Sequence, residues 1–378
     1  MFLVIFILIL IALILVHEFG HFIVAKAFRI RVDEFGIFFP PRLFAKRFGE
    51  TEYSFNALPL GGFVRIFGED RNEAANNPRS FANKPRLVQA AVVVAGVVFN
   101  ILFAWLAFSL GYMVGLPTAA SHEGWGQVRD ARPVIVGVYP DSPAARAGLM
   151  PKDVVVSLQT GKGESTPENA TAKQIREFIA AHQDESVVLS VLRPSTPFDT
   201  TQGKSLGASG EEEKVFLTKA EAGLIEGRKA IGIEIDDVGV LQLPPPEALL
   251  QGAILTKSTT VAVAQGLGGF FSKLLRGAAD FTAVAGPIGI VNFGASAVGQ
   301  GFAAAVVLTA LISINLALIN LLPIPGLDGG RLLIIAVESV LRRPVPERLT
   351  MALTMTGFAL LILLMIVVSY HDIVRLIT

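Results

Sequence analysis

The stretch LVHEFGHFIVAK, residues 15–26, places two histidines, a glutamate and a lysine at the end of an unbroken apolar run. His17 and His21 are four residues apart, so on a helix they share one face, about 6 Å apart along the axis. At this spacing two imidazoles can reach one Zn²⁺ at roughly 2.0–2.1 Å each. Glu18 lies beside them and can take a proton from a metal-activated water, as in the H-E-x-x-H pattern. Histidines in a core or facing lipid are the alternative, but ionisable groups within an apolar span are costly and need a reason.

The composition is that of a membrane protein with a soluble part. Of the 378 residues, 52% are hydrophobic and 17% are charged, and the mean hydropathy is +0.57. Soluble domains carry about 25% charged residues. The formal net charge is zero, so no nucleic-acid partner is expected. The absence of cysteine excludes disulfides, thiolate metal ligands and a cysteine nucleophile.

Four apolar segments predict transmembrane helices, because a bilayer-spanning helix needs roughly 20 apolar residues. A cleaved signal peptide is the alternative for residues 1–16, but no basic residue precedes the apolar run and no small-residue cleavage site follows it. The four predicted spans are 1–28, 87–116, 302–330 and 350–370.

The distribution of Lys and Arg predicts the orientation of these spans. Residues 26–86 hold eleven Lys and Arg and residues 331–348 hold four, so both regions are expected on the cytoplasmic side. The N-terminus, the long middle region and the C-terminal tail then lie outside, which Arg375 opposes only weakly. His17 would lie about 25 Å along the first helix, near the cytoplasmic side of the bilayer.

Residues 120–237 are predicted to form a soluble α/β domain between the second and third spans. Short β-rich runs such as PVIVGVYP (133–140) and ESVVLSVLR (185–193) flank a helical pattern at 168–182. A polar, Gly- and Ser-rich stretch at 195–213 predicts a loop inside the domain.

A short capped helix is expected within DSPAARAGLMPKDVV (141–155). Asp141 or Ser142 can cap a helix that Pro143 begins and Gly148 ends. The pattern resembles PDZ domains of bacterial membrane-associated proteases, which bind extended peptides, often C-termini, by strand addition. Another small α/β domain with a capped helix is the alternative.

Two further segments precede the third span. Residues 246–280 are too polar to cross a bilayer and predict an interfacial amphipathic helix that lies on the membrane. AGPIGI, residues 285–290, predicts a Gly/Pro turn.

A catalytic zinc needs a third protein ligand and an open position. Asp328, within NLLPIPGLDGGRL (320–332), follows the third span after prolines that break the helix. A helix cap or a turn aspartate is its alternative role. The first and third spans run in the same direction, so parity permits His17, His21 and Asp328 to meet. The remaining histidines lie in the soluble domain or the outer tail: His122, His182 and His371.

HEFGH together with LINLLPIPGLDGGR, a PDZ-like segment and GPIGI resembles the site-2 protease family in its bacterial RseP-type form. The resemblance covers nearly the whole chain in the same order. It implies an intramembrane zinc endopeptidase with one Zn²⁺, with His17 and His21 as ligands and Glu18 as the base. The LDG aspartate of the family, which matches Asp328, implies the third ligand.

The resemblance also implies how a substrate is held. The family's substrate-positioning residues match Asn320, Pro323 and Pro325, and Asn315 either helps them or bonds to another helix. Within the cytoplasmic region 29–86, residues 51–68 have strand-like stretches around Gly61 and Gly62. The family has a membrane-re-entrant β-hairpin here that contacts substrate, and a plain cytoplasmic hairpin is the alternative. The chain has room for one PDZ domain, where the best-known enterobacterial form has two.

The expected whole is a polytopic α-helical protein of the bacterial inner membrane with an inserted extracytoplasmic PDZ domain. Its active site lies near the cytoplasmic side. Its expected partners are single-span membrane proteins as substrates, peptide or protein C-termini at the PDZ domain, and the lipid bilayer. Anti-sigma factors and remnant signal peptides are the substrates that the resemblance implies. A catalytically inactive PDZ-bearing scaffold and a zinc transporter are the alternatives.

Overall fold

The computed structural model describes most of the chain and divides it into two compact units. Unit 1 contains Met1–Phe108, Gly252–Val298 and Val306–Thr378, and unit 2 contains Ser109–Gln251 and Gly299–Ala305. The described residues are 1–69, 77–122, 124–167, 169–194, 211–225, 228–277, 287–299 and 301–377.

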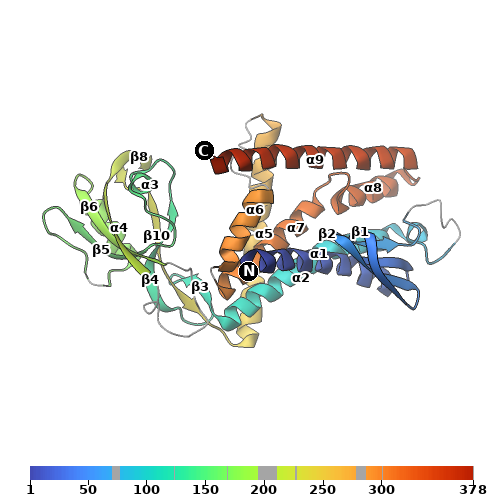
Figure 1. Ribbon diagram of the computed structural model, residues 1–378, viewed down its shortest axis with the longest axis horizontal. Helices are drawn as coiled ribbons and strands as arrows, with labels where there is room; N and C mark the ends of the chain where they lie inside the picture. Colours follow the sequence, from blue (N-terminus) through green and yellow to red (C-terminus); the bar gives the residue numbers. More distant parts are fainter. Residues whose placement is uncertain are drawn as a thin grey trace. The chain divides into compact units, whose positions relative to one another are not determined.

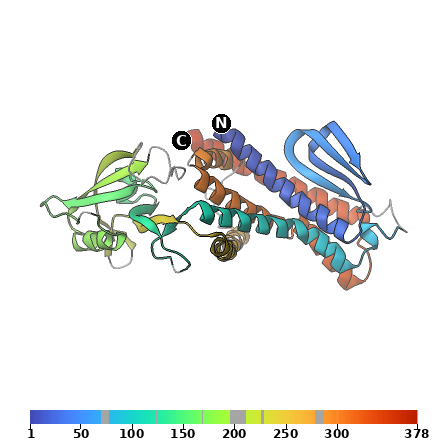
Figure 2. The ribbon, with the colours of Figure 1, turned by 90° about the horizontal axis from the view of Figure 1, so that it is seen from below.

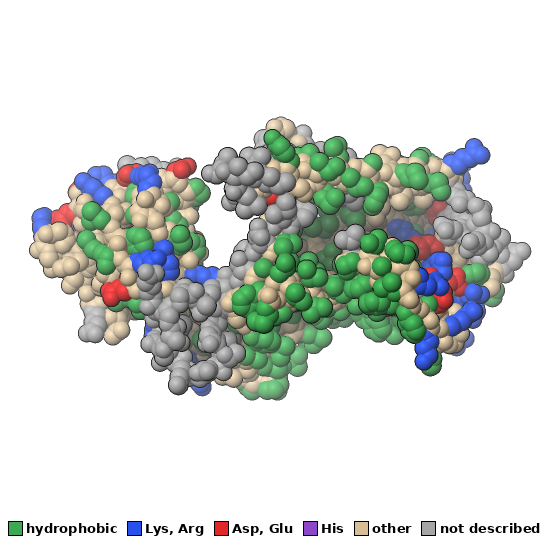
Figure 3. Space-filling view, in the orientation of Figure 1, with side chains coloured by type: hydrophobic (Ala, Val, Ile, Leu, Met, Phe, Trp, Pro, Cys, Tyr) green, Lys and Arg blue, Asp and Glu red, His purple; other side chains and the backbone are tan. Residues whose placement is uncertain are grey.

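Three helices of the described chain are long and apolar enough to cross a membrane. They are α1 (Phe2–Ala27), α2 (Arg86–Val114) and α7 (Phe302–Leu321), which lie at the first three predicted spans (Figure 1). Side chains on α1 such as Val4 and Leu8 are more than half exposed, which suits lipid contact and not water. Apolar side chains cover the helical part of unit 1, and charged ones gather at the end that carries β1 and β2 (Figure 3). The chain is therefore a multi-pass membrane protein.

The predicted break after the third span is present. Helix α7 ends at Leu321, residues 322–327 are non-helical, and α8 (Asp328–Leu341) begins at the aspartate of the LDG motif. Pro323 and Pro325 lack the N–H groups that would continue the helix, which explains the interruption.

Strands β1 (Val32–Phe48) and β2 (Thr51–Ile66) form a folded antiparallel sheet that packs on α1 (Figure 2). Its register places residues 32–37 beside 62–66 on one side and 52–55 on the other, while 42–48 lie beside 51–56. The buried side chain of Glu34 links segments of this sheet through ion pairs.

Glu34 accepts hydrogen bonds from Arg42 at 3.0 Å and from Arg65 at 2.7 Å, so the carboxylate is paired with both edge segments of the sheet. Whether the sheet re-enters the membrane stays a prediction. A short 3₁₀ turn, Phe81–Asn83, follows and leads into α2.

Three more helices complete unit 1. Helix α5 (Pro245–Leu275) covers most of the predicted interfacial segment, and its Leu255 and Val263 pack on the core that α2 shares with α7. Residues 278–280 of that prediction lie outside the described residues. Helix α6 (Pro287–Gly299) replaces the predicted turn over residues 287–290, because a proline is well suited to the first position of a helix; residues 285–286 lie outside the described chain. Helix α9 (Glu347–Ile377) includes the fourth predicted span.

Unit 2 is built on a six-stranded sheet with the order β3-β10-β4-β5-β6-β7, in which neighbouring strands are antiparallel. It extends beyond the predicted domain 120–237 at both ends. Most of the predicted loop 195–213 lies outside the described residues, and its last three residues belong to β7. A two-stranded ribbon of β8 and β9 lies between β7 and β10 in the sequence. The strands are β3 (Leu116–Ala119), β4 (Arg129–Val138), β5 (Val154–Thr160), β6 (Ser186–Pro194), β7 (Glu211–Lys219), β8 (Glu221–Ile225), β9 (Arg228–Ala230) and β10 (Ile233–Leu241).

Two helices, α3 (Pro143–Ala147) and α4 (Ala172–Ala181), belong to the described part of unit 2, and α3 has the caps that its sequence predicts. Ser142 accepts a hydrogen bond from the Ala145 amide, and Gly148 ends α3 with a φ of 91° that favours glycine. Ile175 of α4 packs into an apolar core with residues such as Leu158 and Leu189 of the sheet.

Candidate metal centre

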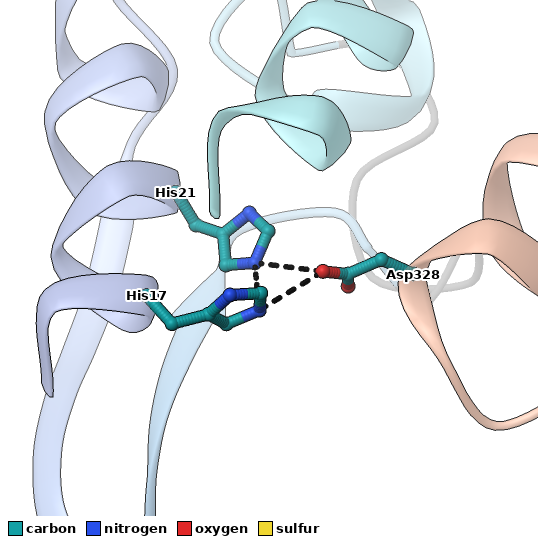
Figure 4. A group of neighbouring side chains, drawn as sticks. All are labelled: His17, His21 and Asp328. Carbon is teal, nitrogen blue, oxygen red and sulfur yellow. Dashed lines mark hydrogen bonds and ion pairs between the residues drawn. The ribbon is translucent and has the colours of Figure 1, made fainter. Parts of the chain in front are cut away.

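Two histidines of α1 lie one above the other on the same helix face (Figure 4). The Nε2 atoms of His17 and His21 are 3.2 Å apart, and the rings meet edge to face with centroids 4.8 Å apart. His17 is only 6% exposed. The spacing of four residues therefore produces the paired imidazoles that the sequence predicted.

Asp328, the first residue of α8, directs its carboxylate at both rings (Figure 4). Its Oδ2 lies 3.0 Å from Nε2 of His17 and 3.3 Å from Nε2 of His21. Gly329 and Gly330 make this position accessible, because a Cβ at either would run into the backbone between Leu321 and Pro325. The first turn of α8 can thus rest directly on the interrupted segment that precedes it.

The three ligand atoms fit a zinc ion. A tetrahedral site with bonds of roughly 2.0–2.1 Å separates its ligand atoms by about 3.3 Å, and the separations here are 3.0, 3.2 and 3.3 Å. Oδ2 of Asp328 is buried and receives no well-directed hydrogen bond from the described residues, although both imidazoles are close. Two imidazole nitrogens and one carboxylate form a donor set that zinc accepts.

Glu18 and the three candidate metal ligands line one cavity, which has a volume of about 180 Å³. The backbone N–H of Val64 in β2 faces the Glu18 carboxylate. The sheet approaches closely here, since a Cβ on Gly62 would lie 3.5 Å from Cγ of Glu18. The base predicted from the sequence is therefore beside the predicted ligands and is oriented by the sheet.

The lining of the cavity also carries a paired charge. Arg331 of α8 forms an ion pair with Glu69, and its guanidinium lies 4.6 Å from the ring centroid of Phe81. All three residues line the cavity. This arrangement keeps the Arg331 charge compensated next to the metal ligands.

The residues predicted to hold substrate are placed unequally. Nδ2 of Asn320 lies 3.3 Å from Nε2 of His17, so Asn320 belongs to the site. Pro323 and Pro325 lie in the segment between α7 and α8, and neither is among the described residues that line the cavity. Asn315 donates to the Leu311 carbonyl at 2.8 Å within its own helix, and its part in holding substrate stays a prediction.

Sequence reasoning missed the residues of α2 that touch the site. The carbonyl of Val92 and the side chain of Asn100 contact the two histidines, and Gly96 lies directly against their rings. An asparagine in an otherwise apolar span is a signal of its own, because polar groups in such spans need partners. The spacing of four between Gly96 and Asn100, which places both on one helix face, was the available clue.

A His-Glu-x-x-His helix, a converging aspartate and membrane-spanning helices around them define a membrane-embedded zinc hydrolase. The profile of peptidase family M50 matches residues 5–364, nearly the whole chain. The chain therefore belongs to peptidase family M50, the site-2 protease family, and it is a zinc metalloprotease.

Relatives that bear the name "Putative zinc metalloprotease" are similar over almost their full length. A protein of Nostoc sp. is 33% identical over 362 residues, which are 94% of this chain and 91% of the relative. One from Synechocystis sp. is 32% identical, with 97% of this chain and 93% of the relative covered. One from Mesorhizobium japonicum is 31% identical and covers 97% of each chain.

Proposed function

We propose that this protein hydrolyses peptide bonds within transmembrane segments of single-span membrane proteins. The observation that carries the proposal is the placement of His17, Glu18 and His21 inside α1, a helix suited to the bilayer, with the Asp328 carboxylate converging on the two histidines. A water-soluble substrate would not reach a site inside the bilayer, whereas a transmembrane segment can enter it laterally from the membrane.

His17, His21 and Asp328 hold the zinc ion in this proposal. When bound, zinc supplies the Lewis acidity that makes water a nucleophile near neutral pH. Glu18 accepts the proton of the attacking water and returns it to the departing amine. In this proposal the Val64 amide orients the Glu18 carboxylate, and Asn320, whose Nδ2 is near Nε2 of His17, donates to the scissile carbonyl.

The substrate must be extended at the cleaved bond, because a helix hides its backbone carbonyls. The segment 62–66 is an edge of the β1–β2 sheet, and Phe63 and Val64 line the cavity. An extended substrate can add to such an edge as a further strand. Backbone groups freed at residues 322–327, with Pro323 and Pro325, offer a second surface to the unwound chain.

We extend the proposal to four spans, with α9 as the fourth. Met355, Phe358 and Leu363 of α9 are each at least 60% exposed, which water would disfavour and lipid would not. The Lys and Arg clusters then place the active site near the cytoplasmic side of a bacterial inner membrane, with unit 2 outside. The described sheet β1–β2 would enter the membrane from the cytoplasm.

Unit 2 is proposed to be a PDZ domain that binds C-terminal peptides. Its antiparallel sheet, the short α3 helix and the longer α4 helix support this, as does the capped DSPAARAG segment. Such a domain would recruit or admit substrates in regulated intramembrane proteolysis. Trimmed anti-sigma factors and remnant signal peptides are the proposed substrate classes.

The test measures zinc content and cleavage of a model single-span substrate by the purified full-length protein. Glu18→Gln should keep one zinc per chain and lose cleavage by roughly 10²–10⁴-fold, since it removes the base and retains the ligands. Glu177→Gln is the matched control, because Glu177 lies on exposed α4 with Lys173 3.9 Å away. It should cleave like the unmodified protein.

Three outcomes would contradict the proposal. Equal cleavage by Glu18→Gln and the unmodified protein would remove Glu18 from the mechanism. Folded protein that neither binds zinc nor cleaves the substrate would favour the inactive PDZ-bearing scaffold. Protein that binds zinc and moves it across a vesicle membrane without cleaving the substrate would favour a transporter.

A further inference from the structure

One face of α2 lies against both candidate zinc histidines. Val92, Gly96 and Asn100 are spaced by four residues, so they form a single row along the helix. His21 Nδ1 lies 2.8 Å from the carbonyl oxygen of Val92, and His17 Nδ1 lies 3.2 Å from the side-chain amide of Asn100. Each histidine thus has one ring nitrogen facing α2 and the other facing Asp328.

For His21, the contact with α2 settles which nitrogen carries the proton. A carbonyl oxygen can only accept, so Nδ1–H of His21 donates to Val92 and Nε2 presents its lone pair. Nε2 is the nitrogen that faces Asp328. The neutral imidazole of His21 is therefore held in the tautomer that a metal ligand requires.

His17 has an amide in the same place. If Nε2 binds the metal, Nδ1 must carry the proton and needs an acceptor. Asn100 presents Nδ2 to this nitrogen, while its Oδ1 is buried with no hydrogen-bond partner among the described residues. A half-turn of the amide exchanges its oxygen and nitrogen, after which Oδ1 accepts from Nδ1–H of His17.

The row is fixed in position from both sides. Asn100 and Ser313 are both fully buried, and the Ser313 hydroxyl of α7 donates to the Asn100 carbonyl at 2.7 Å. On the side of α1, Gly20 lets the helices approach, because a Cβ there would lie 2.6 Å from the Ala95 carbonyl oxygen. The amide of Asn100 is therefore held at a set distance from His17.

Gly96 leaves room for both rings. A Cβ at this position would lie 2.5 Å from Nε2 of His21 and 2.8 Å from Nε2 of His17, closer than real Cβ contacts. Any side chain at residue 96 would push the ligand nitrogens out of place. The absence of a side chain at residue 96 therefore leaves space for the rings of the two metal ligands.

We propose that the Val92–Gly96–Asn100 row of α2 orients the two zinc histidines, with Asn100 as a positioning residue that commits Nε2 of His17 to the metal. This inference rests on the proposed function in that it takes His17 and His21 as zinc ligands. Hydrogen bonds to the far nitrogen of a ligand histidine fix its tautomer and ring orientation, and their loss costs about 10–100-fold in metal affinity or activity.

The test is the zinc dissociation constant of the full-length protein, measured by competition with a chelator. Asn100→Leu, which keeps the size and removes the acceptor, should weaken zinc binding by about 10–100-fold. Asn100→Asp should restore binding, because a carboxylate accepts the same proton. Asn315→Leu is the matched control, since the Asn315 amide bonds only to the Leu311 carbonyl in the described contacts, and its affinity should be unchanged.

A spectroscopic readout separates orientation from general loss of structure. In the Co²⁺-substituted protein, Asn100→Leu should alter the visible ligand-field bands, whereas Asn100→Asp and Asn315→Leu should resemble the unmodified protein. The melting temperature of each metal-free variant shows whether it is folded. If Asn100→Leu does not fold, Asn100→Ala and Asn100→Ser replace it. The Asn100→Ser protein should then bind zinc more tightly than the Asn100→Ala protein.

The outcomes distinguish this inference from the proposed function. His17→Ala should abolish stoichiometric zinc, and zinc retained in that variant would overturn the metal site itself. If His17→Ala loses zinc while folded Asn100→Leu binds it within twofold of the unmodified protein, only the positioning role of Asn100 is wrong.

Discussion

Two aspartates, one in each unit, have opposite surroundings. Asp153 of unit 2 is 1% exposed, and Arg193 donates to both of its carboxylate oxygens at 2.7 Å. The Met150 amide adds a third hydrogen bond at 2.9 Å. Asp328 of unit 1 instead faces two imidazole nitrogens, and its Oδ2 receives no well-directed hydrogen bond from the described residues.

The difference in surroundings indicates different roles for the two carboxylates. The charge of Asp153 is compensated by protein donors, so its surroundings are complete and its role is to hold the fold of unit 2. Asp328 lies among atoms that offer lone pairs, which is the arrangement of ligands around a cation. Substitution at these two aspartates should therefore affect different properties of the protein.

The largest expected effect is that of Asp328→Ala on zinc binding. Complete zinc sites contribute about 10–16 kcal/mol, so one of three protein ligands accounts for about 3–5 kcal/mol, or roughly 10²–10⁴-fold in affinity. Isothermal titration of the metal-free protein with zinc measures the loss. Unit 2 should unfold at its usual temperature, and a shift there would show that the two aspartates are not separate in function.

Asp153→Ala should give the reverse result. Removing one partner of a buried ion pair costs about 3–5 kcal/mol, and the lower end is expected because Arg193 is 20% exposed and keeps its bond to the Gly148 carbonyl. Thermal unfolding and protease sensitivity of unit 2 measure the loss, and zinc content should not change. Asp184→Ala, at an exposed pair with Lys229, is the control and should have no measurable effect.

A smaller effect is expected at the cap of α3. Ser142→Ala removes the acceptor of the Ala145 amide and should destabilise unit 2 by about 0.5–2 kcal/mol. Ser142→Gly should cost only a few tenths of a kcal/mol at this position. If Ser142→Ala unfolds at the same temperature as the unmodified protein, the cap does not stabilise the helix.

The smallest expected effect is a dependence of the stability of unit 2 on pH. The Phe178 carbonyl, and then the Glu164 carboxylate, hold the pKa of His182 above its ordinary value. The protonated ring favours the folded state, so its contribution is complete below the ordinary pKa of about 6.5 and is lost as pH rises through the higher folded value. Melting temperatures between pH 5 and 8 should show this loss, and His182→Gln should remove it; an unchanged profile in that variant would contradict the assignment.

The metal centre could largely be predicted from the sequence because its parts have local signatures. The spacing of His17 and His21 follows from the helix repeat, and the prolines before Asp328 announce a break in α7. Parity of the spans was enough to suggest that Asp328 reaches the histidines. The cap of α3 was likewise readable, since Ser142, Pro143 and Gly148 act on their immediate neighbours.

The contacts of α2 and the folded β1–β2 register could not be predicted in the same way. Asn100 meets His17 across 83 residues, and nothing in its local sequence says which helix it faces. Glu34 pairs with Arg42 and Arg65 only once the sheet has folded back on itself. The turn predicted near Pro287 became the first turn of α6, because proline favours both situations.

The most direct test of the account is zinc-edge X-ray absorption of the purified full-length protein and of His21→Ala. The account predicts one zinc per chain with two imidazole ligands and oxygen in the remaining positions. His21→Ala should lose one imidazole from the zinc or lose the metal altogether. A zinc whose imidazole count is unchanged in His21→Ala would place the metal elsewhere and contradict the account.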